Sequence, residues 1–182
     1  MFHPGTQKLI DCWTTARIDA GAPARRDIDP ARFAKLLPQV FILGRDGPGL
    51  YPFRLAGGFL NSVHGGALNR KNGLRLWSVG DRPKVQAALE SIRRVAEPVV
   101  ITTELTAEGM LSASMEVLLA PLAGPDGEVD RYLGLYQPTA PLQRNNDEVV
   151  GAMVMHSIHW ADPAVAASPA LRLATLDGRR IA

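Results

Sequence analysis

The stretch YPFRLAGGFL, residues 51–60, contains the change of pattern that decides the fold. Apolar side chains alternate with other residues from Tyr51 to Ala56, as in a β-strand with one buried face. The alternation stops at Gly57 and Gly58, and the residues that follow are typical of a helix. Glycine allows a sharp turn, and neither G-x-G-x-x-G nor G-x-x-x-x-G-K-[ST] includes this pair. We therefore interpret it as a corner between strand and helix rather than a phosphate-binding loop.

The segments on either side of this stretch form an ordered series of strands and helices. Upstream, the apolar run QVFILG and the turn residues after it predict a second strand that pairs with the first as a hairpin. Downstream, glycines keep the predicted helices short until a longer helix from Asp81 to Ala96. Three strands follow, in PVVITTELT, MLSASMEVLLAPL and RYLGLYQP. This order predicts an α+β fold, in which a five-stranded antiparallel sheet has helices inserted after its second strand.

Both ends of the chain carry further predicted elements. Residues 6–20 and 29–38 have the spacing and caps of helices. Residues 148–160 are predicted to form an amphipathic helix that packs on the domain. Residues 171–181 alternate briefly, and the alternatives are that they add a strand, cross to a partner subunit, or become ordered only in a complex. The predicted division is an N-terminal helical extension (1–38), a central domain (39–137) and a C-terminal extension (138–182).

The composition excludes several classes of protein. A formal net charge of +2 over 182 residues, without a basic run, argues against nucleic-acid binding. The single cysteine, Cys12, excludes an internal disulfide and a cysteine-rich metal site. The N-terminus lacks a secretory pattern, and no apolar run approaches the roughly 20 residues that span a bilayer. We expect a cytoplasmic protein without membrane insertion.

The central domain resembles a PAS domain. The residues that carry this resemblance are FRLAGGFLNSVHG, KNGLRLW, the helix from Asp81 to Ala96, and the closing strands with EVLLAPL and RYLGLY. Together with RRDIDPARFAKLLPQVFIL upstream, they are similar to stand-alone bacterial PAS-domain proteins of the MopJ-like family. The resemblance implies sensing or protein–protein signalling rather than catalysis, with a regulatory protein such as a signalling kinase as the partner.

The residues that hold cofactors in other PAS domains have no counterpart here. Flavin photosensors of this fold use a reactive cysteine near the short helices, but residues 71–77 contain none. Haem sensors take a histidine from the long helix, and residues 81–96 contain none. Cys12 lies too far upstream to hold a covalent chromophore in the domain. No cofactor is identified, and a non-covalent ligand, including unmodified flavin, stays open.

The resemblance implies a candidate cavity between the sheet and its helical cover. The strand alternation places Phe53 and Leu55 toward this cavity and Arg54 away from it. The predicted ligand-binding residues are Phe53, Leu55, Asn61, His64, Arg75, Trp77 and Met115. The alternative is that these side chains fill an ordinary core.

Other titratable residues give no catalytic or metal site. His156 and His159 are three residues apart, but no cysteine or fourth ligand accompanies them. Glu104 and Glu116 fall on the polar side of their strands with Arg54, where cross-strand ion pairs can form if the strands are neighbours. We interpret this face as a solvated or interface-facing surface of the sheet rather than a catalytic carboxylate pair. We therefore predict neither catalytic nor metal-binding residues.

Two functional hypotheses follow. The first is a signalling module that binds a regulatory partner and forms a homodimer through its N-terminal helix, with Leu9 and Trp13 as the anchors. The second is a carrier of small molecules, or a small enzyme, that uses the same cavity. The second hypothesis requires an acid–base group that points inward, and the sequence does not identify one.

Overall fold

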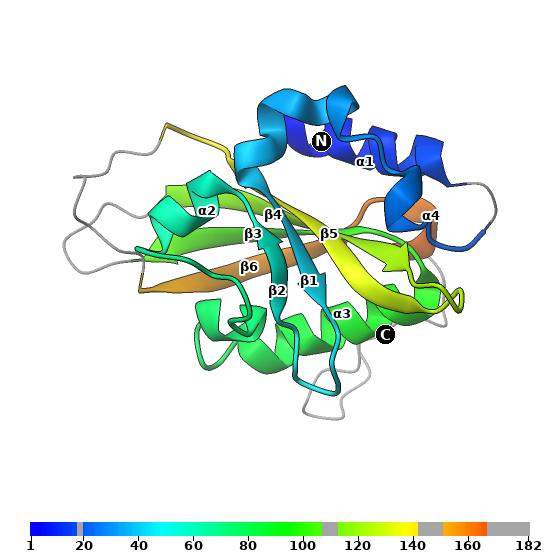
Figure 1. The fold of residues 1–182 in the computed structure, drawn as a ribbon. Coiled ribbons are helices and arrows are strands. Elements are labelled where there is room, and N and C mark those ends of the chain that lie inside the picture. The colour runs from blue at the N-terminus through cyan, green and yellow to red at the C-terminus, as the bar shows by residue number, and fades with distance from the viewer. Residues whose placement is uncertain (18–19, 107–112, 142–150, 167–182) are drawn as a thin grey trace.

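The computed structural model describes residues 1–17, 20–106, 113–141 and 151–166. It contains an antiparallel sheet in the strand order β2-β1-β5-β4-β3-β6 (Figure 1). The strands are β1 (Val40–Gly44), β2 (Phe53–Ala56), β3 (Val99–Thr106), β4 (Ala113–Ala123), β5 (Val129–Pro138) and β6 (Ala152–Trp160). The α+β fold, the hairpin of β1 with β2 and the three closing strands are thereby confirmed, and a sixth strand extends the sheet.

Helices cover both faces of this sheet (Figure 1). The helical elements are α1 (Pro4–Ala16), η1 (Arg25–Asp27), η2 (Pro30–Gln39), α2 (Gly58–Val63), η3 (Gly73–Leu76), α3 (Arg82–Val95) and α4 (Pro163–Ala166), where η denotes a 3-10 helix. We call the face that packs against α2, η3 and α3 the inner face, and the face that packs against α1 and η2 the outer face. Each face has its own hydrophobic core, so the structure has three layers. Within the described residues, no helix is long and apolar enough to cross a membrane.

The first helix, α1, packs on the sheet of its own chain. Pro4 occupies its first turn, and the His3 imidazole accepts a hydrogen bond from the Gly5 N–H, which caps the helix. The helix ends at Ala16, four residues before the predicted end. Its side chains Leu9 and Trp13 are 0% and 1% exposed in the outer core. The sheet of the same chain therefore covers both side chains, and their role as dimer anchors stays a prediction.

The predicted helix over residues 148–160 is wrong for the residues of this segment that the structure describes. Residues 152–160 form β6, which pairs with β3. The pairing passes from Ser157 opposite Thr102 to Met155 opposite Thr103, which leaves His156 as an extra, bulged residue. The inserted residue interrupts the two-residue alternation of apolar side chains in β6. The apolar spacing of residues 148–160 therefore resembled that of a helix. Residues 148–150 and the predicted strand at 171–181 lie outside the described residues.

The open edge of β6 is partly covered by the segment that leads into α3. The Ser78 N–H donates to the Met153 carbonyl at 2.8 Å, and the Met155 N–H donates to the Asp81 carboxylate at 3.1 Å. Asp81 precedes α3 as predicted, but its side chain does not cap that helix. It holds the last described strand against the helical layer, so part of the edge is protected from further pairing.

A second bulge changes which way the side chains of β2 point. Leu55 pairs with Ile42 and Phe53 with Leu43, so Arg54 is an extra residue between them. Because Ile42 and Leu43 belong to opposite cores, Phe53 faces inward and Leu55 faces outward. The prediction that both residues face the inner cavity is wrong for Leu55. Bulges commonly re-aim a side chain in this way.

Candidate functional site

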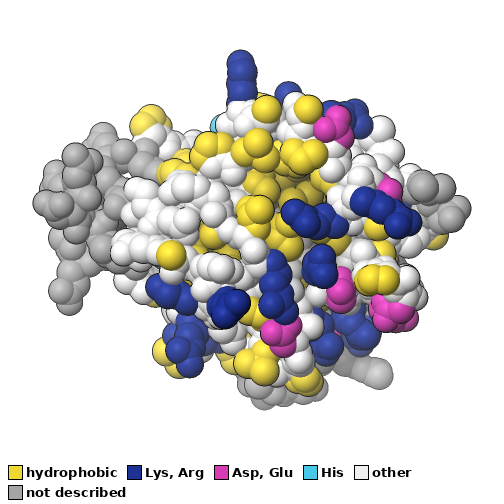
Figure 2. Space-filling model, in the orientation of Figure 1, with side chains coloured by type: hydrophobic (Ala, Val, Ile, Leu, Met, Phe, Trp, Pro, Cys, Tyr) yellow, Lys and Arg dark blue, Asp and Glu magenta, His cyan; other side chains and the backbone are white. Residues whose placement is uncertain are grey.

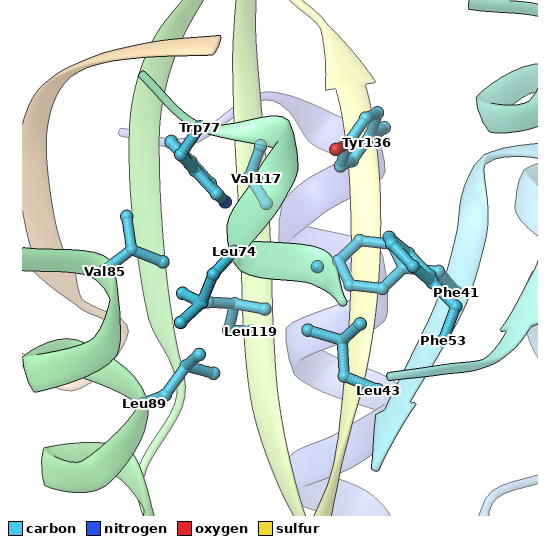
Figure 3. A pocket seen from close by; sticks show the side chains of 11 residues that line it. Phe41, Leu43, Phe53, Leu74, Trp77, Val85, Leu89, Val117, Leu119 and Tyr136 are labelled. Atoms are coloured by element: carbon cyan, nitrogen blue, oxygen red, sulfur yellow. The ribbon is translucent and has the colours of Figure 1, made fainter. Parts of the chain in front are cut away.

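The inner face contains the cavity that the sequence predicted, but it is almost filled. Eleven residues from β1, β2, β4, β5, α3 and the segment around η3 surround it, with their side chains pointing toward one another (Figure 3). Its volume is about 10 Å³, which is room for about one water molecule. The lining residues are Phe41, Leu43, Phe53, Gly73, Leu74, Trp77, Val85, Leu89, Val117, Leu119 and Tyr136.

Aromatic rings fill most of the space at the β1 side of this cavity. Phe41 makes edge-to-face contacts with Phe53 and Tyr136, at centroid distances of 5.7 Å and 5.4 Å. The Phe41 ring lies directly over Gly134 of β5, where an added Cβ would come within 2.0 Å of the ring. Burial raises the pKa of the Tyr136 hydroxyl above its usual range, so this group stays neutral. The sequence contained one signal for this arrangement, the glycine inside RYLGLY.

The predicted ligand-binding residues lie in different parts of the structure. Phe53 and Trp77 line the cavity, and Met115 belongs to the same core without lining it. His64 lies close by, with its ring 5.8 Å from that of Tyr136. Leu55 lies on the outer face.

Asn61 and Arg75 have local structural surroundings. The Asn61 side-chain oxygen accepts from the Leu68 N–H at 3.1 Å, which closes the loop after α2. Arg75 is exposed, and its carbonyl accepts a hydrogen bond from Arg82 at 3.4 Å. Neither residue is among those that line the cavity, so the structure does not bring the seven predicted residues together.

A partly buried polar cluster at the β1–β2 hairpin was missed from the sequence. The Tyr51 hydroxyl donates to Glu90 at 2.5 Å, and Arg45 donates to the same carboxylate at 2.8 Å. Burial raises the pKa of Glu90, but the hydrogen bonds from Arg45 and Tyr51 outweigh it and hold the pKa below its usual value. A carboxylate that stays ionised between two donors is suited to tying α3 to the hairpin and unsuited to taking up a proton at neutral pH.

Glu104 and Glu116 do not pair with Arg54, because β2 is not a neighbour of β3 or β4. Glu116 is buried and accepts hydrogen bonds from the His3 N–H at 3.0 and 3.1 Å, which fixes the start of α1 on β4. Glu104 lies 3.4 Å from the His156 ring. Arg54 pairs with Asp46 in the adjacent turn. The described residues contain no cluster of three or more His, Cys, Asp or Glu side chains that could hold a metal ion.

The outer face carries a larger depression, which we call the outer groove. It has a volume of about 430 Å³. Figure 2 shows apolar side chains gathered on this side of the molecule, with Lys and Arg side chains beside them. The lining residues are Arg25, Arg26, Ile28, Pro30, Phe33, Leu37, Val40, Ile42, Leu55, Leu122, Arg131 and Leu133. The sequence did not indicate this site, because its lining combines residues from 25–55 with residues from 122–133, which are far apart in the chain.

Comparison with protein families identifies the fold. Residues 1–137 match a family model described as PAS domain, and this chain therefore belongs to the PAS domain family. The match includes α1 and η2 as well as the five strands β1–β5. The PAS fold supports a signal-sensing module.

Solved structures of similar fold include light-oxygen-voltage domains. The dark structure of the photoreceptor Aureochrome1 LOV has a TM-score of 0.48 and 12% identity, covering 68% of this chain and 89% of that chain. A LOV domain studied with a flavin analogue has a TM-score of 0.47 and 17% identity, covering 62% and 87%. A LOV protein of Rhodobacter sphaeroides has a TM-score of 0.46 and 15% identity, covering 66% and 72%. No curated protein matches the chain.

Proposed function

We propose that this PAS domain is a non-enzymatic sensory module that signals by binding a regulatory protein, such as a signalling kinase, in the cytoplasm. The observation that carries the proposal is the inner cavity of about 10 Å³ in a chain of the PAS family. Sites for small metabolites usually have volumes of about 300–1,000 Å³. A module whose interior is occupied by its own side chains depends on its surface to transmit a signal.

The alternative function, a carrier or small enzyme that uses the inner cavity, has less support. The only hydrogen-bonding side-chain groups among the lining residues are the Tyr136 hydroxyl and the Trp77 indole N–H. Burial keeps the first of these protonated, and an indole N–H is not an acid or a base at neutral pH. A ligand in this cavity, including a flavin, would have to displace the rings of Phe41, Phe53 and Trp77.

The test is a phosphorylation assay with purified signalling kinases from the same cell. We expect saturating PAS protein to change the autophosphorylation rate of one kinase severalfold and to leave the other kinases unchanged. Unchanged rates for every kinase, with no complex detected by sedimentation, would count against the proposal. An absorption spectrum and native mass spectrum of the same sample would test the alternative, which requires a co-purifying metabolite.

Homodimer formation is part of the same proposal, and family resemblance is what supports it. Leu9 and Trp13, the predicted anchors, are buried within the chain, so a dimer that uses them would require α1 to leave its own sheet. Sedimentation equilibrium over a micromolar concentration range measures this directly. A single monomeric species throughout that range would remove the homodimer from the proposed function.

A further inference from the structure

The outer groove lies between two parts of the chain that close on it from opposite sides. The N-terminal segment contributes residues of η1 and η2, among them Arg25, Phe33 and Leu37. The sheet contributes residues of β1, β2, β4 and β5, among them Leu55 and Arg131. The volume of about 430 Å³ falls in the range of small-molecule sites, in contrast to the inner cavity.

Apolar residues form most of the lining of the groove, and two of them are exposed to solvent. Phe33, Ile42 and Leu133 are buried beneath it. Leu37 and Leu55 stand at its sides with 42% and 40% of their surface exposed. Leu55 is there because the Arg54 bulge turns it to the outer face. Grouped exposed apolar side chains mark binding surfaces more often than single ones do.

The charged part of the groove is entirely basic. The lining residues include Arg25, Arg26 and Arg131 and no acidic residue. Arg26 and Arg131 have acidic neighbours only at 3.8 Å, the outer limit of an ion pair. No ion pair of Arg25 is found within the described part of the chain. Guanidinium groups bind carboxylates with two parallel hydrogen bonds, so these arginines can hold an anionic head group.

We propose that the outer groove binds a small amphipathic anion, that is, a carboxylate attached to an apolar chain or ring. The apolar body would lie against Leu37, Leu55 and the buried side chains beneath them, and the carboxylate would pair with the arginines. Such a ligand would connect the η1–η2 segment to the sheet. A protein partner is less well suited, because stable protein interfaces bury about 1,600 Å² in total and this groove is a compact hollow.

This proposal does not depend on the proposed kinase partner, and its experiment measures binding alone. Isothermal titration with dodecanoate, below the concentration at which it forms micelles, is compared with dodecyltrimethylammonium, which has an alkyl chain one carbon longer and the opposite charge. We expect one dodecanoate per chain and binding of the cation at least about tenfold weaker, as expected when charge-assisted hydrogen bonds are lost.

Variants of residues with exposed or half-buried side chains locate the site without opening the core. The double variant Arg25→Gln/Arg131→Gln and the single variant Leu55→Asn should each weaken dodecanoate binding about tenfold. The matched controls are Arg94→Gln on α3 and Leu50→Asn in the hairpin turn, both exposed and outside the groove, and they should bind as the unaltered protein does. Circular dichroism spectra confirm that all variants are folded.

Several results would overturn the proposal. They are no heat of binding with dodecanoate, equal binding of the cation, or equal affinity in the groove variants and the controls. A dimer that dissociates in Leu55→Asn, with no dodecanoate binding, would assign the groove to a second copy of this chain instead. Cross-linking of the groove to a different protein, again without dodecanoate binding, would assign it to protein docking.

Discussion

The two faces of the sheet are built from similar residues but differ in how completely they are closed. On the inner face, aromatic and aliphatic side chains from six elements leave about 10 Å³ unfilled. On the outer face, the N-terminal segment covers only part of the sheet and leaves a groove of about 430 Å³. Phe53 and Leu55, two residues apart on β2, point to these two environments. The pocket expected from a fold is therefore not always where the open volume lies.

The largest expected difference between the faces is at these two residues. Phe53→Ala should lower the free energy of unfolding by about 3–5 kcal/mol, because it opens a cavity in a filled core. Leu55→Ala should lower it by less than about 1 kcal/mol, because the side chain is already 40% exposed. Urea denaturation measures both. Equal effects would contradict the assignment of the two side chains to opposite faces by the Arg54 bulge.

A second prediction tests how tightly the inner face is closed. Gly134→Ala should destabilise the protein by about 1–3 kcal/mol, because its new methyl group would lie within 2.0 Å of the Phe41 ring. Gly80→Ala is the matched control, since a Cβ at that position meets nothing within 4 Å. Thermal or urea denaturation of the pair gives the difference. If Gly134→Ala were as stable as the control, the Phe41 ring could move easily and the inner cavity could open for a ligand.

These two predictions concern features that the sequence did not determine. The alternation of Tyr51 to Ala56 correctly predicted β2, and the order of elements correctly predicted the PAS fold. The bulges at Arg54 and His156 depend on registers with β1 and β3, which local patterns do not contain. Each bulge adds one residue to its strand. At Arg54 the extra residue turns Leu55 to the other face of the sheet, and at His156 it makes the apolar spacing of β6 resemble that of a helix.

Residues of the candidate site were predicted correctly only where the strand alternation, or the order of elements in the PAS family, indicates which way a side chain points. Phe53 and Trp77 line the inner cavity as expected. Leu9 and Trp13 were correctly recognised as an apolar helix face, but the sequence did not indicate that the sheet of the same chain buries it. The outer groove requires contacts between segments far apart in the chain, and neither segment alone has a binding motif.

A third prediction tests the anchoring of α1 on the outer face. The Trp13 indole N–H donates to the Pro121 carbonyl at 2.7 Å in a buried environment. Trp13→Phe keeps most of the apolar surface and removes this donor, so the free energy of unfolding should fall by about 1–2 kcal/mol. Sedimentation of the folded variant should match that of the unaltered protein. A change in its oligomeric state with unchanged stability would instead indicate that Trp13 is a dimer contact.

The smallest expected effect concerns the link between α3 and β6 on the inner side. Burial raises the pKa of Asp81, but hydrogen bonds from Ser78, the Met155 N–H and Lys84 outweigh it, and the net pKa is lowered. The folded state therefore binds fewer protons than the unfolded state near pH 4. The contribution of Asp81 to stability is present above the ordinary aspartate pKa and is lost as pH falls through the lower folded value.

Hydrogen exchange at the Met155 amide provides a local measurement of this link. As pH falls through the lowered pKa of Asp81 and the carboxylate becomes protonated, its oxygen becomes a weaker acceptor for the Met155 N–H. Exchange protection at Met155, corrected for the intrinsic pH dependence of exchange, should fall, while protection in the central strands β4 and β5 should persist. Ser78→Ala removes one donor to Asp81, so the loss should begin at a higher pH. Loss of protection at the same pH in β6, β4 and β5 would instead indicate that the whole sheet opens together. Asp81 would then make no separate contribution to holding β6 in place.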